Sequence, residues 1–150
     1  MRNHGFTLLE VMIALVIFSF GLLALAALMA KGLQYNTSAL HRSYASSQAY
    51  DMADRIRANR PTLEPPFYYQ DINPPAAEPP SCRCDDACPC DTEAMATFDA
   101  WQWNSANANV LPSGSGTVDR SGTTYRITLT WDDDRDITTA DLRFVFEFQP

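Results

Sequence analysis

The chain begins with a long hydrophobic stretch that predicts a membrane-spanning helix. Residues 6–30 read FTLLEVMIALVIFSFGLLALAALMA, and Glu10 is the one ionisable side chain among them. At about 1.5 Å per residue, this run exceeds the roughly 20 residues that a helix needs to cross a bilayer core. Arg2 precedes the run, so the positive-inside rule favours a single pass with a cytoplasmic N-terminus.

The same helix is expected to continue through residues 31–60, to about residue 58. Asn59 and Pro61 provide stop signals, and no proline occurs earlier in the chain. The arginines near this end suit the helix dipole, and we expect them to be solvated. Apolar side chains recur at helical spacing, with small residues between them, and predict a core-facing stripe: Leu33, Leu40, Tyr44, Met52 and Ile56.

The C-terminal third alternates apolar and polar residues, which predicts strands that each have one apolar face. Residues 125–131 and 142–148 carry this pattern, and Thr117–Arg120 is a candidate third strand that forms a hairpin with the first of them. Before them, TEAMATFDAWQWNSANANV predicts a short helix with Met95, Phe98 and Trp101 facing the core. An apolar face of this sheet laid on residues 33–56 of the long helix gives an α+β fold.

Residues 61–92 separate the two helices and are rich in proline and cysteine. Residues 61–80 contain seven prolines, which remove backbone donors and disfavour regular structure. The aromatic run at residues 67–69 is either a binding patch or an anchor that holds the loop on the head, and we expect the anchor. The acidic run Asp132–Asp136 invites a calcium site, but it lacks the glycine and distal glutamate of an EF-hand loop, so we expect a solvated turn.

The four cysteines form one C-x-C-x₃-C-x-C cluster with two possible chemistries. Four thiolates bind zinc tetrahedrally, whereas two disulfides would stiffen a segment that lacks core contacts. Because residues beyond Ala30 are expected to be periplasmic, where disulfides persist, we favour disulfides and no bound metal. Pairing of nearest neighbours would form strained rings, so the crossed and the nested pairings both remain open. The cysteines concerned are Cys82, Cys84, Cys88 and Cys90.

Charge and composition argue against several classes of function. Residues 61–150 carry five arginines against fifteen acidic residues, a balance of −10, which disfavours direct binding to nucleic acid. Apart from His4 near the N-terminus, His41 is the sole histidine, and the sequence has no phosphate-binding glycine loop, nucleophile motif or paired-carboxylate signature. We therefore expect neither an enzyme nor a cofactor.

The N-terminal sequence GFTLLEVMIAL resembles the processing signal of the type IV pilin and type II secretion pseudopilin superfamily. The resemblance implies that prepilin peptidase cuts after Gly5 and removes residues 1–5. It also implies that Phe6 becomes a methylated N-terminus and that Glu10 pairs with the ammonium of a neighbouring subunit during assembly. A secretory signal peptide and a plain membrane anchor are the alternatives. Against the signal peptide, the apolar run exceeds the usual 7–15 residues and contains a glutamate.

The segment SYASSQAYDMADRIRANR resembles the equivalent stretch of PilV-type minor pilins, and the ITLTWDD segment again resembles that group. This implies a type IV pilin-like fold, in which a long N-terminal helix supports a periplasmic head of residues 61–150 with strands within 117–149. It also implies a minor pilin that helps to initiate type IV pili, and so supports twitching motility, adhesion and DNA uptake indirectly. The expected partners are prepilin peptidase, membrane lipid, other minor pilins, the major pilin and the inner-membrane assembly platform.

Two other functions remain open. A minor pseudopilin of type II secretion would share the same N-terminal signal and long helix. A tip-displayed adhesin that binds metal or another ligand through its cysteine loop would use the same architecture for a different purpose.

Overall fold

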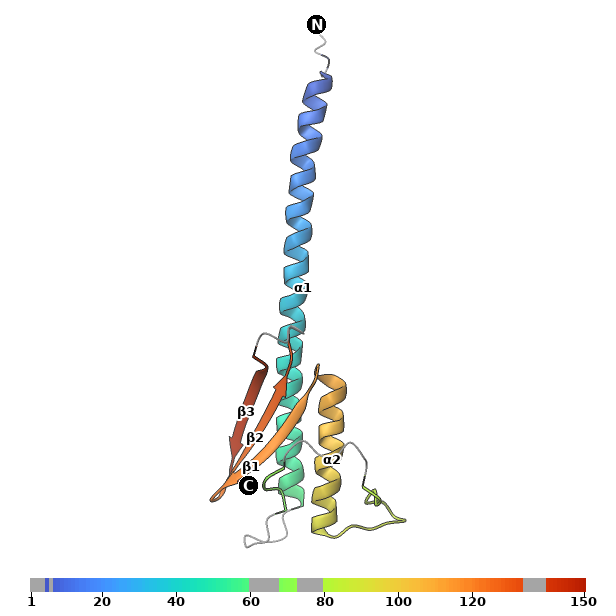
Figure 1. Ribbon diagram of the computed structural model, residues 1–150, viewed down its shortest axis with the longest axis vertical. Helices are drawn as coiled ribbons and strands as arrows, with labels where there is room; N and C mark the ends of the chain where they lie inside the picture. Colours follow the sequence, from blue (N-terminus) through green and yellow to red (C-terminus); the bar gives the residue numbers. More distant parts are fainter. Residues whose placement is uncertain (1–4, 6, 60–67, 73–79, 134–139) are drawn as a thin grey trace. The chain divides into compact units, whose positions relative to one another are not determined.

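The computed structural model describes residues 5, 7–59, 68–72, 80–133 and 140–150. Phe6, Arg60, most of the proline-rich loop and Asp134–Asp136 therefore lie outside the described residues. The chain divides into two compact units, Met1–Ala39 and Leu40–Pro150. The elements shown in Figure 1 are α1 (Leu8–Ala58), α2 (Thr92–Val110), β1 (Ser115–Ser121), β2 (Thr124–Trp131) and β3 (Leu142–Phe148).

Helix α1 has 51 residues and begins two positions after the proposed cleavage site. In the first unit its large apolar side chains are exposed on every side, because no other element of that unit covers them in the part of the chain described. Continuous exposed apolar surface on this scale is characteristic of contact with lipid or with other helices. The helix ends at Ala58, and the amide of the next residue, Asn59, still donates to the Arg55 carbonyl at 2.9 Å.

The second unit, Leu40–Pro150, forms the head together with the end of α1, and it contains an antiparallel sheet of order β1-β2-β3. A two-residue turn closes the β1–β2 hairpin, and Gly122 adopts a φ of +60° there, which suits a glycine in a tight hairpin. Strand β1 starts at Ser115, two residues before the expected start. On β2 the predicted alternation places four side chains in the core: Tyr125, Ile127, Leu129 and Trp131. The predicted fold class, a long helix packed on a small antiparallel sheet, is confirmed.

The stripe of α1 that packs against the head is made mainly of small residues. Its buried members are Ala45, Ala49, Met52, Ala53 and Ile56. The predicted stripe was therefore only partly right: Met52 and Ile56 are buried, whereas Leu33, Leu40 and Tyr44 are 69%, 49% and 41% exposed. Alanine at successive turns allows neighbouring elements to approach the helix backbone closely, and Met52 and Ile56 fill the remaining space.

Helix α2 starts at a capping residue, since the Asp91 carboxylate accepts a hydrogen bond from the Ala94 amide at 2.8 Å. Its predicted core face was wrong, because Met95, Phe98 and Trp101 are only half-buried. The buried face lies on another side of the helix and combines small and polar residues with a single large one: Ala96, Asp99, Ala100, Trp103, Asn104 and Asn107.

The far end of α2 continues regularly past Asn107, which is fully buried. Neither polar atom of its side chain has a hydrogen-bond partner among the described residues. The helix ends three residues later at Val110, where the Leu111 backbone turns extended and Pro112 follows.

Candidate functional site

The first turn of α1 holds the candidate assembly residue, Glu10. Thr7 caps this turn: its carbonyl accepts hydrogen bonds from the amides of Glu10 and Val11 at 3.1 and 3.3 Å, and its hydroxyl accepts from the Glu10 amide at 3.3 Å. The sequence Thr-Leu-Leu-Glu has the Thr-x-x-Glu spacing of a capping box, a signal that the sequence reasoning missed. The Glu10 carboxylate is exposed at the N-terminal end, where the helix dipole favours negative charge.

The surface beside Glu10 is otherwise apolar. Glu10 lines a shallow groove with Val11, Ala14, Leu15 and Phe18, all on one face of the helix. Ala14 lies one turn after the carboxylate, and its small side chain leaves room for a neighbouring helix to approach. No cation within the described part of the chain pairs with Glu10. The arrangement is therefore a single carboxylate at the edge of an apolar groove, which favours an external cation as its partner.

Helix α1 is also the one helix, among the described residues, that is long and apolar enough to cross a membrane by length and composition. Its apolar window lies near the N-terminus and none of it is buried within the chain. Gly5, on the N-terminal side of the helix, is exposed. Phe6, the expected new N-terminus, lies outside the described residues.

A polar network joins the end of α1 to α2 in the head. The Arg55 guanidinium donates to Asp51 and to Asp99, both at 2.9 Å, and to Gln102 at 2.6 Å. Burial alone would lower the pKa of Arg55, but its ion pairs with the two aspartates raise that pKa above the ordinary value. The expectation that this arginine is solvated was therefore wrong, whereas Arg57 is exposed and pairs with Asp54 at 2.8 Å.

The loop between the helices is tied to the same network through Tyr69. Its hydroxyl donates to Asp99 at 2.5 Å and accepts from the Asn59 side chain at 3.0 Å. Asn59 also donates to the backbone carbonyl of Thr92, the first residue of α2, at 2.8 Å. Burial and the hydrogen bond to Asp99 raise the pKa of Tyr69 well above its usual range. Tyr69 is 4% exposed, so it anchors the loop on the head, as expected.

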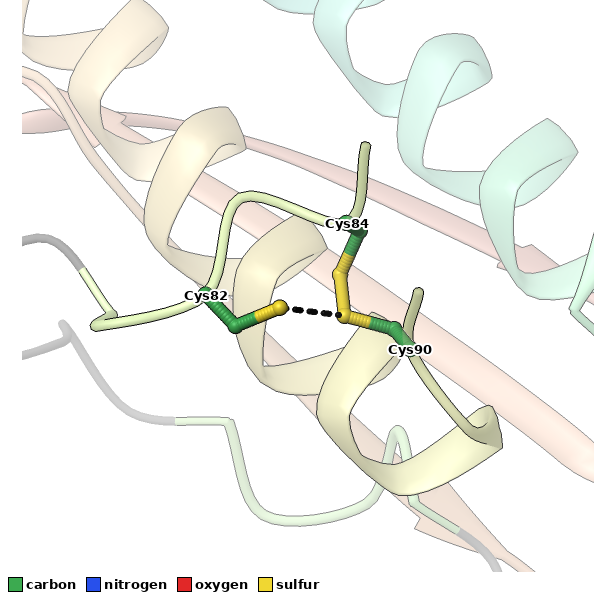
Figure 2. A group of neighbouring side chains, drawn as sticks. All are labelled: Cys82, Cys84 and Cys90. Carbon is green, nitrogen blue, oxygen red and sulfur yellow. Dashed lines mark hydrogen bonds between the residues drawn. A yellow bond between two sulfur atoms is a disulfide. The ribbon is translucent and has the colours of Figure 1, made fainter. Parts of the chain in front are cut away.

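The cysteine segment lies just before α2. In the structure, disulfide bonds join Cys82 to Cys88 and Cys84 to Cys90, which is the crossed arrangement. Figure 2 shows the Cys82 sulfur pointing toward the Cys84–Cys90 disulfide, at 3.5 Å from the Cys90 sulfur. The sulfurs of Cys82, Cys84 and Cys90 lie within 4.8 Å of one another, so the same residues could serve a soft metal ion if they were reduced.

The remaining candidate residues are the histidine of α1 and the acidic run that follows β2. Nδ1 of His41 lies 2.9 Å from Oδ1 of Asp133, which also accepts from the Trp131 indole at 3.2 Å. Asp133 thus links α1 to the end of β2. The rest of the acidic run proposed for calcium, Asp134–Asp136, lies outside the described residues.

Comparison with protein families supports the N-terminal site. Residues 1–26 match the prokaryotic N-terminal methylation motif, which covers Gly5, Phe6 and Glu10. Residues 27–101 match the family described as type IV pilin Tt1218. The chain belongs to this type IV pilin family. The matched part of this pilin runs from Ala27 in α1 to Trp101 in the middle of α2, so the sheet lies beyond it.

Neither the comparison with curated proteins nor the comparison with solved structures gave a match. Type IV pilins form a family of structural subunits. The family also implies membrane anchoring, processing by prepilin peptidase and assembly with other pilins.

Proposed function

We propose that this pilin is a minor subunit of the PilV type, which helps to initiate and assemble type IV pili. The observation that carries the proposal is Glu10, the single ionisable side chain in the apolar run of residues 6–30, most of which matches the N-terminal methylation motif. The resemblance of residues 43–60 to PilV-type pilins supports the minor role. Twitching motility, adhesion and DNA uptake would depend on this subunit indirectly, through the pili that it helps to form.

The precursor is processed at the junction of Gly5 and Phe6. Prepilin peptidase cleaves after Gly5, and methylation of Phe6 completes the mature N-terminus. Cleavage removes Arg2 with the leader and places an ammonium group four residues before Glu10. Helix α1 begins at Leu8, so the new terminus precedes the helix by two residues in the sequence.

Glu10 then pairs with the Phe6 ammonium of a neighbouring subunit. A charged side chain near the bilayer centre costs about 3 kcal/mol on insertion scales, and the cost falls toward the helix end. In a low-dielectric bundle, opposite charges attract strongly enough to offset much of that cost. A subunit whose Glu10 is still unpaired therefore favours docking of the next subunit in register, and the apolar groove around Ala14 receives the neighbouring helix.

We place the N-terminus in the cytoplasm before processing, α1 in the inner membrane and the head in the periplasm, from which the subunit enters a pilus at the cell surface. The partners are other minor pilins, the major pilin and the inner-membrane assembly platform. The four cysteines form the two disulfides of the head. Their proposed role is structural, because they close loops in a segment that has few core contacts.

Substitution of Glu10 tests this function. We expect Glu10→Gln and Glu10→Ala to reduce incorporation of the subunit into sheared pili about tenfold or more, while its amount in the membrane stays unchanged. Asp54→Asn is the matched control, because Asp54 is an exposed carboxylate on the same helix, 74% exposed, and lies within the head. Unchanged incorporation of the Glu10 variants would show that the proposed charge pairing is wrong.

Deletion of the chain tests the minor role separately. Absence of an initiating subunit should reduce the number of pili per cell without shortening those that remain. Loss of protein secretion with normal pilus number would instead favour a pseudopilin of type II secretion.

A further inference from the structure

A small cleft in the head combines an apolar floor with two arginines. The cleft has a volume of about 280 Å³ and is lined by Arg42, Trp131, Leu142, Arg143 and Phe144. Trp131 is 2% exposed, and Leu142 and Phe144 are half-buried, so the floor is fixed by the core. This volume is below that of most small-molecule sites and suits one or two protein side chains.

The two arginines on the cleft have no partner in the part of the chain described. Arg42 and Arg143 are both exposed, and neither forms an ion pair with a described residue. Arg55, Arg57 and Arg126, by contrast, each pair with a carboxylate. Two like charges at one cleft repel each other and do not stabilise the fold. In a chain with a net charge of −7, such a cleft is complementary to a pair of carboxylates.

The cysteine segment presents a pair of this kind. Asp85 and Asp86 are adjacent and exposed, and the crossed disulfides flank them on both sides. The Asp85 carboxylate accepts hydrogen bonds from the amides of Ala87 and Cys88 at 3.1 and 3.0 Å through one oxygen, Oδ1, and these bonds fix the turn. We call residues 82–90 the knuckle.

The knuckle and the cleft lie at opposite ends of the head. The knuckle stops at Cys90, two residues before Thr92, whose carbonyl is bonded to Asn59 at the end of α1. Arg42 precedes Ala58, the last residue of that helix, by 16 residues, or about 24 Å. Figure 1 shows the same separation: the loop before α2 lies where α1 ends, and the start of β3 lies toward the other end of the head. A head therefore cannot place its own knuckle in its own cleft.

We propose that the head of one copy of this chain binds the next copy head to tail, with the Asp85–Asp86 knuckle inserted at the Arg42–Arg143 cleft. Because the two surfaces differ, the contact is heterologous, and it propagates into chains and not into closed pairs. The two guanidinium groups donate hydrogen bonds to the two carboxylates. Ala87 follows the acidic pair in the sequence and contacts the apolar floor. The contact adds a second copy of the chain to the proposed neighbours in the filament. It rests on the proposed function, because the filament brings the copies together.

The test measures self-association of the full-length mature protein in detergent micelles by analytical ultracentrifugation. The cleft variant, Arg42→Gln/Arg143→Gln, and the knuckle variant, Asp86→Arg, should each weaken self-association about tenfold, since exposed ion pairs contribute modestly one by one. Lys31→Gln/Arg126→Gln removes the same number of positive charges away from the cleft and should have no effect. Added salt should weaken the wild-type association and leave the variants nearly unchanged.

Mixing the two variants gives the sharpest result. The cleft variant keeps an intact knuckle and the knuckle variant keeps an intact cleft, so an equal mixture should form dimers and no longer chains. A wild-type protein that stays monomeric, or a cleft variant that associates as the wild type does, would overturn the proposal. Neither result bears on the filament function, which depends on Glu10 and is tested by incorporation into pili.

Discussion

Asn104 on α2 and Gly116 on β1 exchange two hydrogen bonds. The side-chain nitrogen of Asn104 donates to the Gly116 carbonyl at 3.1 Å, and the backbone amide of Gly116 donates to the side-chain oxygen of Asn104 at 2.7 Å. Both residues are buried. Trp103 lies against the same glycine and donates its indole N–H to the Gln48 carbonyl on α1 at 2.8 Å. These contacts join α1, α2 and the first strand at one point.

Gly116→Ala should destabilise the head by about 2 kcal/mol or more, because overpacking of a filled core is costly. A Cβ at this position would lie 2.2 Å from a Trp103 ring carbon and 2.9 Å from the Asn107 side-chain nitrogen. Denaturant unfolding of the purified protein, followed by tryptophan fluorescence, measures the loss. Gly32→Ala is the control: a Cβ added there would meet nothing within 4 Å, so this variant should leave the head unaffected.

Asp99→Ala should destabilise the head by about 2–3 kcal/mol, because it removes the acceptor shared by Arg55 and Tyr69 and leaves both groups partly unsatisfied. The matched control is Asp54→Ala, which removes an exposed carboxylate paired with Arg57 and should cost under about 1 kcal/mol. Equal losses in the two variants, measured by the same unfolding experiment, would show that the buried network adds no more stability than the exposed Asp54–Arg57 pair.

Tyr69 makes the stability of the head depend on alkaline pH. Its folded pKa is raised above the ordinary 10 by burial and by the hydrogen bond to Asp99. The unfolded chain therefore releases the phenolic proton first, and the stabilisation is fully present below about pH 10 and is lost as the pH rises through the folded pKa. Tyr69→Phe should cost about 1 kcal/mol near neutral pH.

The stability of the wild type and that of Tyr69→Phe should depend differently on pH. The advantage of the wild type over Tyr69→Phe should stay constant up to about pH 10 and shrink above it. Unfolding curves collected across this range measure the difference. An advantage that stayed constant at higher pH would mean that Tyr69 ionises as easily in the folded head as in the unfolded chain.

The disulfides should stabilise the head by about 2 kcal/mol each on the chain-entropy model, because each closes a short loop with a sequence separation of 6. Protein isolated without reductant should have no free thiol. Cleavage after Arg83, followed by tandem mass spectrometry that breaks the chain at Pro89, should link Cys82 to Cys88. A link from Cys82 to Cys90 would show the nested pairing, and four titratable thiols with bound zinc would favour the metal site.

Large-scale features followed from local patterns. Uninterrupted apolar sequence and the stop at Asn59 were enough to predict α1, and strict alternation from Tyr125 to Trp131 was enough to predict β2. Both signals are local, because the faces of a helix or a strand are set by its own periodicity. The Glu10 site was found for the same reason: a charge inside an apolar run is visible without knowledge of the fold.

Features that depend on distant partners were missed. Arg55 and Asp99 are 44 residues apart, so nothing near Arg55 in the sequence showed that it would be half-buried in a network. The buried face of α2 was misassigned because large apolar residues were expected to face the core. In the structure, Asn104 is buried because it bonds to Gly116, and the half-buried Phe98 and Trp101 rings lie 5.8 Å apart. The spacing of the cysteines left two pairings open, since only the fold of the knuckle brings particular sulfurs together.

The central claim is that the chain functions as a processed pilin whose new terminus pairs with Glu10. The most direct measurement is the intact mass and N-terminal residue of the protein recovered from its own cells. We predict a chain that begins at N-methylated Phe6, with residues 1–5 absent and Glu10 retained. A mature chain that begins at any residue other than Phe6 would contradict the account.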